Sequence, residues 1–197
     1  MNATYLRDMA VLTVTDPAEA ARRLMTLRPG REVLWLALAL VIVLNTFLHA
    51  VSNLLVPVQA TELQALSESL VLYVLVAGGG LVLSILAFYL VGSRMGGTGT
   101  FNEIMTLMVW LQFMRVLVQA IMLVLLITVP ILSVIAALAA FLLGLYITVH
   151  FLDQAHRFGS PATALGVLVL SALAIAVVLV VLMTLIGGPM MGTPANV

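Results

Sequence analysis

Residues 104–152 have the sequence IMTLMVWLQFMRVLVQAIMLVLLITVPILSVIAALAAFLLGLYITVHFL, and this apolar stretch decides the fold. A single helix through all of it would be about 72 Å long, whereas the hydrocarbon core of a bilayer is about 30 Å thick. Pro130 disfavours helix at Val129 and suits the first turn of a new helix. We therefore expect two membrane spans joined by a tight hairpin; one long helix kinked at Pro130 is the alternative.

Three further stretches are long and apolar enough to cross a membrane. Together, the predicted spans are residues 33–55, 70–91, 104–129, 130–152 and 162–186. The composition agrees, since 63% of the 197 residues are hydrophobic and 8% are charged, against about 25% charged in soluble domains. The sequence predicts an all-α polytopic membrane protein with a five-helix transmembrane bundle, and it argues against a soluble enzyme or a nucleic-acid-binding protein.

The arginines indicate the orientation of the chain in the membrane. The sequence has eight Arg and no Lys, and seven of these Arg lie in segments that five spans place on one side. Because positive charge marks cytoplasmic segments, we expect a cytoplasmic N-terminal segment (residues 1–32), a transmembrane domain (33–186) and a short external tail (187–197). An Arg-only, Ala-, Val- and Leu-rich composition is typical of a GC-rich bacterial genome, hence an inner membrane with a periplasmic C-terminus.

The N-terminal segment contains a predicted amphipathic helix at residues 17–27. Asp16 can cap this helix, Pro17 suits its first position, and Glu19 lies where a capping box has an acid. Such a helix is expected to lie in the headgroup plane of the membrane. Its arginines either contact anionic lipid or a soluble partner, or only anchor the topology. The residues concerned are Arg22, Arg23, Arg28 and Arg31.

Arg115 is the most costly residue of the predicted bundle, because it lies near the middle of the third span, where a charge costs at least about 2.5–3.5 kcal/mol. Asn45 lies at matching depth on the first span. We expect a polar seam between these spans, in which Arg115 donates to Asn45, with His49 as a second acceptor. The seam residues are Asn45, His49, Gln112, Arg115 and Gln119.

Three roles are open for this seam: hydrogen bonding between helices, a ligand or lipid-headgroup site, and a path for a solute. The seam has no acid at mid-depth, which a proton-coupled carrier would often use. A water-accessible cavity that reaches Arg115 would favour the ligand or transport role. A dry, hydrogen-bonded Arg115 would favour the structural role.

The sequence contains no catalytic or metal-binding motif, so we expect no enzyme activity and no cofactor. It lacks Cys and lacks H-E-x-x-H. His150 and His156 do not share a helix face, while Asp153 and Arg157 are spaced to pair with each other.

Two glycine-rich segments stand out. The triplet at residues 78–80 either allows a neighbouring helix to approach closely or loosens its own helix, and close packing is the commoner reason. The glycines between residues 92 and 99 are expected to make their loop flexible.

Several motifs together resemble one family of membrane proteins. In chain order they are TDPAEAAR at residues 15–22, GGTGTFNE at 96–103, WLQ at 110–112, the Pro130 break, and a polar helix end at 146–156 followed by FGS at 158–160. This pattern is similar to the Yip family of five-span proteins, in its bacterial branch. The resemblance covers roughly residues 15–186 and implies five spans with a cytoplasmic N-terminus.

The resemblance also limits the function. Eukaryotic Yip proteins bind prenylated Rab-type GTPases and shape membranes, but they have a longer head with an acidic-Leu-Tyr-Gly-Pro motif that this chain lacks. We therefore expect a non-enzymatic membrane organiser or scaffold, with a small transporter or lipid-handling protein that uses the seam as the alternative. The expected partners are membrane lipids, and a membrane protein or a second copy of the chain; nucleic acid is not expected.

Overall fold

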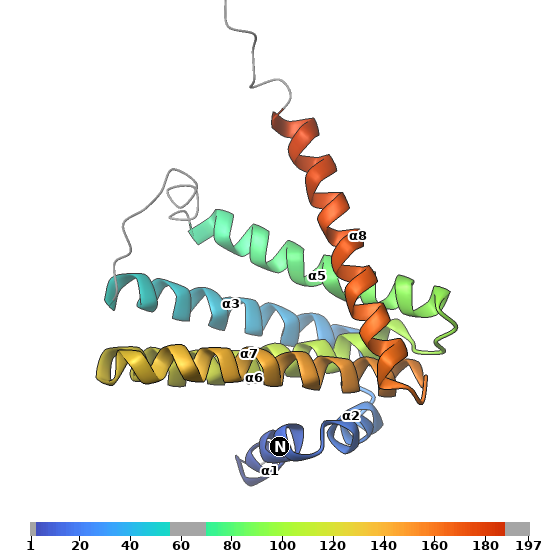
Figure 1. The fold of residues 1–197 in the computed structure, drawn as a ribbon, viewed down its shortest axis with the longest axis horizontal. Helices are drawn as coiled ribbons and strands as arrows, with labels where there is room; N and C mark the ends of the chain where they lie inside the picture. The colour runs from blue at the N-terminus through green and yellow to red at the C-terminus, as the bar shows by residue number, and fades with distance from the viewer. Residues whose placement is uncertain (1–2, 56–69, 188–197) are drawn as a thin grey trace, which may run out of the picture.

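The computed structural model describes residues 3–55 and 70–187, so residues 188–197 of the predicted external tail lie outside the described residues. The division of the chain into domains at residues 32 and 186 stays a prediction. The described residues form seven helices (Figure 1). These are α1 (Ala3–Thr15), α2 (Pro17–Thr26), α3 (Arg31–Leu55), α5 (Leu70–Arg94), α6 (Phe101–Thr128), α7 (Pro130–His156) and α8 (Pro161–Gly187).

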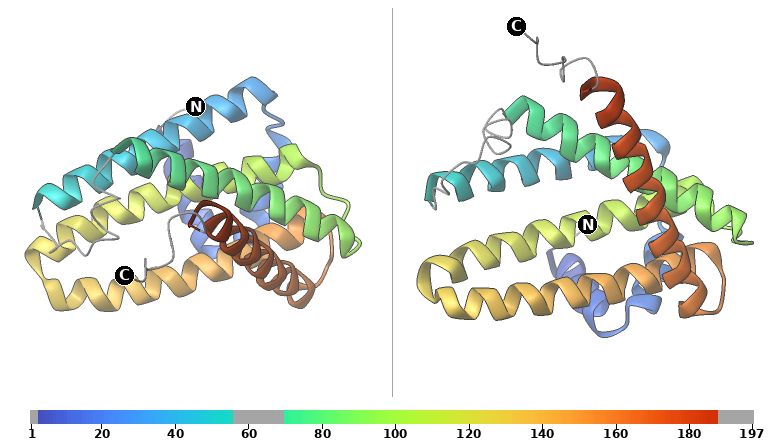
Figure 2. Two further views of the ribbon diagram at one scale, coloured as in Figure 1. Left: turned by 90° about the horizontal axis from the view of Figure 1, so that it is seen from above. Right: turned by 45° about the horizontal axis from the view of Figure 1, so that its top comes forward.

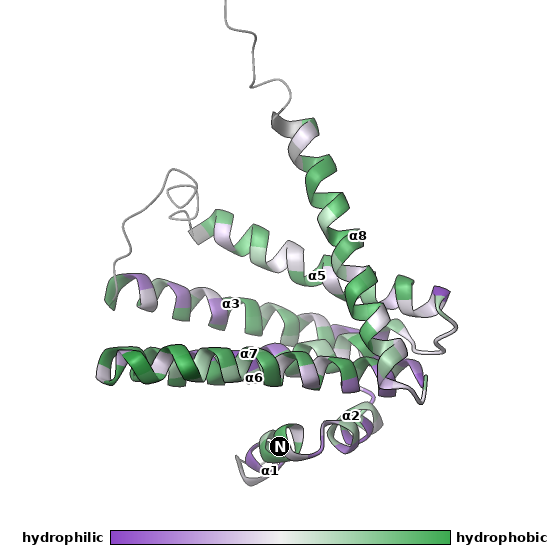
Figure 3. Ribbon diagram, viewed as in Figure 1, coloured by the Kyte–Doolittle hydropathy of each residue, from purple (hydrophilic) through white to green (hydrophobic). Residues whose placement is uncertain are grey.

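Five of these helices, α3, α5, α6, α7 and α8, are long and apolar enough to cross a membrane. Their ribbons are predominantly hydrophobic in Figure 3. The predicted all-α bundle of five spans is therefore confirmed. The helices extend a few residues past the predicted spans at one end, because hydropathy marks the apolar segment whereas helical hydrogen bonding continues into polar residues until a cap ends it.

The predicted hairpin at Pro130 is present. Val129 leaves the helical conformation (φ −141°, ψ 81°), ends α6 and precedes Pro130, the first residue of α7. Its N–H still donates to the carbonyl of Leu125 at 2.7 Å. The two helices run side by side in opposite directions (Figures 1 and 2), so the long apolar stretch is two spans and not one kinked helix.

The five spans lie close together at one end and spread apart at the other, an arrangement that we call a fan. Helices α3, α6 and α7 lie along one another, whereas α5 and α8 diverge from them (Figures 1 and 2). The fan is closed where α2 and the loops after α5 and α7 gather, and it is open toward the hairpin at Pro130. We call the closed side the arginine-rich end, because it contains Arg31, Arg94 and Arg157.

Helices α1 and α2 form a head that packs against α6 and α7 at the arginine-rich end (Figure 1). Asp16 caps α2 by accepting a hydrogen bond from the Glu19 N–H at 3.0 Å, so the predicted helix start is confirmed. The apolar face of α2 packs on protein, since Ala20, Ala21 and Leu24 are buried. The position of this helix in the headgroup plane stays a prediction.

A hydrogen bond fixes the head to α6. The Trp110 Nε1–H donates to Thr13 Oγ1 at 2.9 Å, and the Thr13 hydroxyl donates to the Met9 carbonyl. Trp110 is only 8% exposed, whereas Trp35 on α3 is 48% exposed. All residues of α6 from Ile104 to Trp110 are buried, so this half of α6 lies at the centre of the protein.

Replacing Trp110 with Phe should loosen the head while keeping the aromatic packing. Loss of one buried hydrogen bond costs about 0.5–1.5 kcal/mol, so trypsin cleavage of the head in detergent should become about two- to tenfold faster. Trp35→Phe is the matched control and should leave the cleavage rate unchanged. Equal acceleration by both variants would contradict a specific role for the bond to Thr13.

Candidate functional site

A partly open cavity of about 440 Å³ lies between α3, α5, α6 and α8. Its polar lining comes mainly from one face of α6, where Gln112, Arg115 and Gln119 are spaced to lie together. The complete lining is Ile42, Asn45, Tyr73, Val76, Ala77, Gly80, Leu81, Ser84, Gln112, Arg115, Gln119 and Ile175. Four of the five predicted seam residues are thus brought together around one cavity.

The fifth, His49, does not line the cavity but contacts it indirectly. Its ring stacks on Tyr73, with ring centroids 4.1 Å apart and an interplanar angle of 4°, and Tyr73 is a lining residue. The Nε2 atom of His49 lies 3.2 Å from the Nδ2 atom of Asn53. His49 therefore contacts Asn53 on its own helix and Tyr73 on α5, and it does not contact Arg115 as predicted.

The predicted hydrogen bond from Arg115 to Asn45 is wrong. The Asn45 side chain instead donates to the carbonyl of Val41, one turn earlier, at 2.9 Å. That bond uses one Nδ2–H of Asn45 and holds its side chain along its own helix. Arg115 is exposed, and within the part of the chain that the structure describes it makes no hydrogen bond or ion pair.

The cavity is positively charged. Arg115 lies at the middle of α6, which has 28 residues, and no Asp or Glu is among the lining residues. A guanidinium presents five N–H donors in a planar fork that matches carboxylate and phosphate. Water or an anion must meet this charge, because an unpaired charge at mid-membrane depth is costly.

The glycine triplet of α5 packs closely at one position only. A Cβ atom added to Gly78 would lie 3.2 Å from Ile42 Cδ1, whereas one added to Gly79 or Gly80 would meet nothing within 4 Å. The expected close helix approach therefore applies to Gly78 alone. Gly80 faces the polar cavity, so the absence of a side chain there enlarges the cavity.

His156, whose role was not predicted from the sequence, ends α7 and is 1% exposed. Its Nε2 atom lies 3.1 Å from the Phe88 carbonyl oxygen on α5. Its Nδ1 atom is buried without a hydrogen-bond partner among the described residues, and its ring stacks on Phe158. No pattern in the sequence indicated this contact, because Phe88 lies 68 residues before His156 in the chain.

Glycines surround the His156 ring. A Cβ atom added at Gly92 or Gly97 would overlap the imidazole, and one added at Gly99 would lie 2.6 Å from the Ala155 carbonyl oxygen. The expectation that these glycines make the loop flexible is therefore wrong for three of the four, since they allow close packing. The Thr98 N–H also donates to the His156 carbonyl at 3.1 Å. We call these contacts the histidine clamp (His156 with Gly92, Gly97 and Gly99).

One ion pair joins the end of α7 to the start of α6 at the arginine-rich end. The expected pairing of Arg157 with Asp153 is absent. Arg157 instead donates to both carboxylate oxygens of Glu103. This hydrogen bonding raises the pKa of the Arg157 guanidinium above its usual value. Arg157 has a left-handed backbone (φ 58°) that turns its side chain onto α6, and Asp153 accepts from the Ser160 N–H at 2.8 Å.

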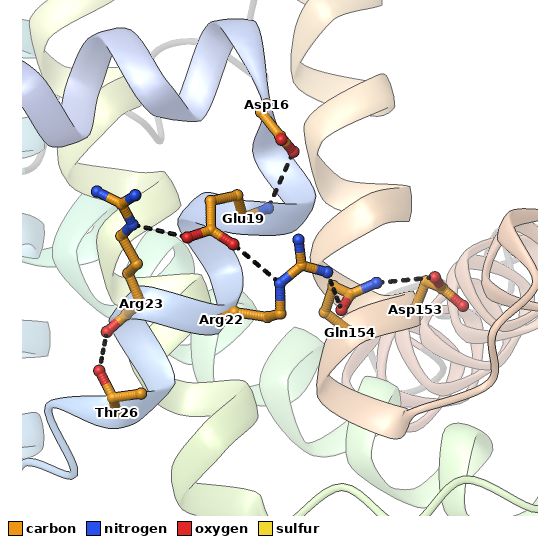
Figure 4. A network of polar contacts seen from close by, with 7 residues as sticks. All are labelled: Asp16, Glu19, Arg22, Arg23, Thr26, Asp153 and Gln154. Carbon is orange, nitrogen blue, oxygen red and sulfur yellow. Dashed lines mark hydrogen bonds and ion pairs between the residues drawn. The ribbon is translucent and has the colours of Figure 1, made fainter.

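The head arginines fall into two groups. Arg22 and Arg23 share the Glu19 carboxylate (Figure 4), and hydrogen bonds from Arg23 and Arg22 hold the pKa of Glu19 below its usual value. Arg22 also donates to Gln154 of α7 at 3.3 Å. Arg28 and Arg31 are exposed and have no partner among the described residues, so they are available to lipid or to another protein.

The fold and the site together define a small helical integral membrane protein with five spans, a docked two-helix head and an arginine-lined cavity. Among the described residues, no group of three or more His, Asp or Glu could hold a metal ion. The chain belongs to the Yip1 domain family, whose model matches residues 11–183. The match includes the last five residues of α1, all of α2 and all but the end of α8. No curated protein matches the chain, and no solved structure does.

Replacing Gly92 with Ala tests the histidine clamp. The added methyl group would overlap the His156 ring, and such overpacking typically costs about 1–3 kcal/mol, so the thermal unfolding temperature in detergent should fall. Gly79→Ala is the matched control on the same helix and should not lower it. The cost of Gly92→Ala should shrink in a His156→Ala background; an unchanged cost there would show that the imidazole is not the cause.

Proposed function

We propose that this protein is a non-enzymatic lipid-handling protein of the bacterial inner membrane, which binds an anionic amphiphile through Arg115. The observation that supports this function is the unpaired, exposed guanidinium in an acid-free cavity between four spans. A structural arginine would be expected to bond to a neighbouring helix, because polar side chains in lipid gain stability by interhelical hydrogen bonds.

An amphiphile suits this cavity better than a free solute does. The cavity lies between helices that diverge (Figure 2), and its lining is polar on α6 but largely apolar on α5. A phospholipid can place its phosphate at Arg115 while its chains stay in an apolar environment. Lipid binding at this depth would draw polar groups into the membrane and deform it, which relates lipid handling to membrane organisation.

A scaffold that acts through the head is the second candidate. The observation that favours it is the exposure of Arg28 and Arg31 without partners in the described part of the chain. Exposed arginines near a membrane surface attract anionic lipid or an acidic partner, with about 1 kcal/mol for each residue. This candidate gives no role to the cavity, so the two candidates differ in what Arg115 contributes.

The proposed orientation places the arginine-rich end in the cytoplasm and the Pro130 hairpin in the periplasm. The sequence contains no Cys, so single cysteines can be labelled without background. In intact cells, a membrane-impermeant maleimide should label Val129→Cys and should leave Ser93→Cys unlabelled until the membrane is permeabilised. Labelling of both, or of Ser93→Cys alone, would contradict this orientation.

Replacing Arg115 with Gln tests the lipid-handling function. The variant should accumulate normally, because Arg115 bonds to no described residue, but it should retain at least about tenfold less phosphatidylglycerol than the wild type in native mass spectrometry, since hydrogen bonds to charged groups contribute about 1.5–3 kcal/mol.

Arg94→Gln is the matched control for this experiment, because Arg94 is exposed at the arginine-rich end and is not a lining residue. It should retain phosphatidylglycerol as the wild type does. Failure of Arg115→Gln to accumulate would support a structural arginine instead, and normal retention by Arg115→Gln would contradict lipid binding at the cavity.

A further inference from the structure

A second opening, a groove of about 470 Å³, lies between α3 and α5. Every residue that lines it is apolar, and two of them are glycines of the α5 triplet. The lining is Trp35, Leu38, Ala39, Ile42, Gly78, Gly79, Val82, Leu83 and Leu86. No described side chain fills the space beside Gly79, since a Cβ atom added there would meet nothing within 4 Å.

The groove and the polar cavity adjoin each other. Ile42 lines both openings, and its contact with Gly78 marks the boundary between them. On α5, Gly79 faces the groove and its neighbour Gly80 faces the cavity. The openings therefore lie on two sides of α5 and are separated by the side chain of Ile42.

The two openings also differ in depth along the bundle. From Ile42 the groove follows α3 to Trp35, which is about 10 Å closer to the arginine-rich end. The cavity extends the opposite way, to Tyr73 and Gln119, toward the open side of the fan. An elongated molecule that occupies both would have its polar part toward the open side and its apolar part toward the arginine-rich end.

We propose that the groove holds one acyl chain of the lipid whose phosphate binds at Arg115. This inference rests on the proposed function and names its ligand: an anionic phospholipid of the leaflet opposite the head, drawn toward the centre of the membrane. Its phosphate contacts the guanidinium and the amides of Gln112 and Gln119. Its chain passes Ile42 and Gly79, and its methyl end lies beside Trp35.

The positive charge of Arg115 and the adjacency of the two openings at Ile42 favour a lipid over other occupants. Arg115 is unpaired and no acid lines its cavity, so the bound polar group is an anion. The apolar groove begins at the boundary of that cavity, and an occupant that joins an anion to a flexible apolar chain fits both. An apolar helix would fill the groove without meeting the charge of Arg115.

Trp35 provides a direct test, because bromine on an acyl chain quenches the fluorescence of a tryptophan that it contacts. The protein is placed in phosphatidylcholine vesicles with a small fraction of brominated phosphatidylglycerol. This lipid should quench at least twofold more strongly than brominated phosphatidylcholine at the same fraction. Bromine near the methyl end should quench more than bromine near the glycerol, and Trp35→Phe should abolish the difference between the two lipids.

Matched glycine variants separate the groove from the cavity. Gly79→Leu should fill the groove and remove the selective quenching, and Gly80→Leu should fill the cavity and remove both the quenching and the retention of phosphatidylglycerol. Gly144→Leu, on α7 and outside both openings, is the control and should change neither, because a Cβ atom at Gly144 also meets nothing within 4 Å.

The outcomes distinguish this inference from the proposed function. Retention of phosphatidylglycerol through Arg115 without selective quenching of Trp35 would overturn the acyl-chain site and leave the proposed function standing. If the wild type shows neither retention of phosphatidylglycerol nor selective quenching of Trp35, the proposed function and the acyl-chain site are both overturned. If millimolar inorganic phosphate abolishes the selective quenching, the ligand of Arg115 is a free anion and the inference fails. Stronger quenching by bromine near the glycerol would reverse the orientation and overturn it as well.

Discussion

The close contact between the His156 ring and three glycines is the constraint on which the arrangement of the spans depends. This contact packs the loop between α5 and α6 against the end of α7. The Nε2 atom of the same ring also lies within hydrogen-bond distance of the Phe88 carbonyl oxygen on α5. Only residues without a Cβ atom can lie this close to an imidazole. Toward the other end of α5, the stack of His49 on Tyr73 joins α5 to α3, and the polar cavity is lined by residues of α5 between these two contacts, from Tyr73 to Ser84.

This arrangement leaves a charge without a protein partner in the middle of a span. Bringing Asn45 and Arg115 together would remove much of the cost, since both lie 14 residues from the start of their helices. The Asn45 side chain instead donates to the Val41 carbonyl on its own helix, and it makes no hydrogen bond with Arg115. The cost of an exposed guanidinium at this depth is at least about 2.5–3.5 kcal/mol, a large part of the 5–15 kcal/mol that stabilises a typical protein. Such a cost is easier to understand if a ligand offsets it.

The sequence predicted those features that depend on local rules. Hydropathy located five spans, the conformational restrictions of proline located the hairpin, and Asp16 with Pro17 located the start of α2. It also indicated which residues would share a cavity, because Gln112, Arg115 and Gln119 must lie on one face of any helix. These predictions need only the geometry of a single helix and the thickness of a bilayer.

Pairing between helices was not predictable in the same way. Arg157 has an acid four residues earlier on its own helix, yet it binds Glu103, because its left-handed backbone ends the helix and redirects the side chain. The glycine-rich loop appeared flexible because glycine lowers local order, whereas in the fold the same property permits close packing around His156. The sequence specifies which residues are small or charged, but the relative placement of the helices decides what each one contacts.

Helix α6 shows how one span can serve two purposes. Trp110 and Arg115 are five residues apart, so they point about 140° away from each other around the helix axis. The first binds the head through Thr13 and the second lines the cavity. The half of α6 near the head is enclosed by protein, and the half beyond it has exposed positions. Arg115 is therefore the first exposed residue of α6 counted from the arginine-rich end.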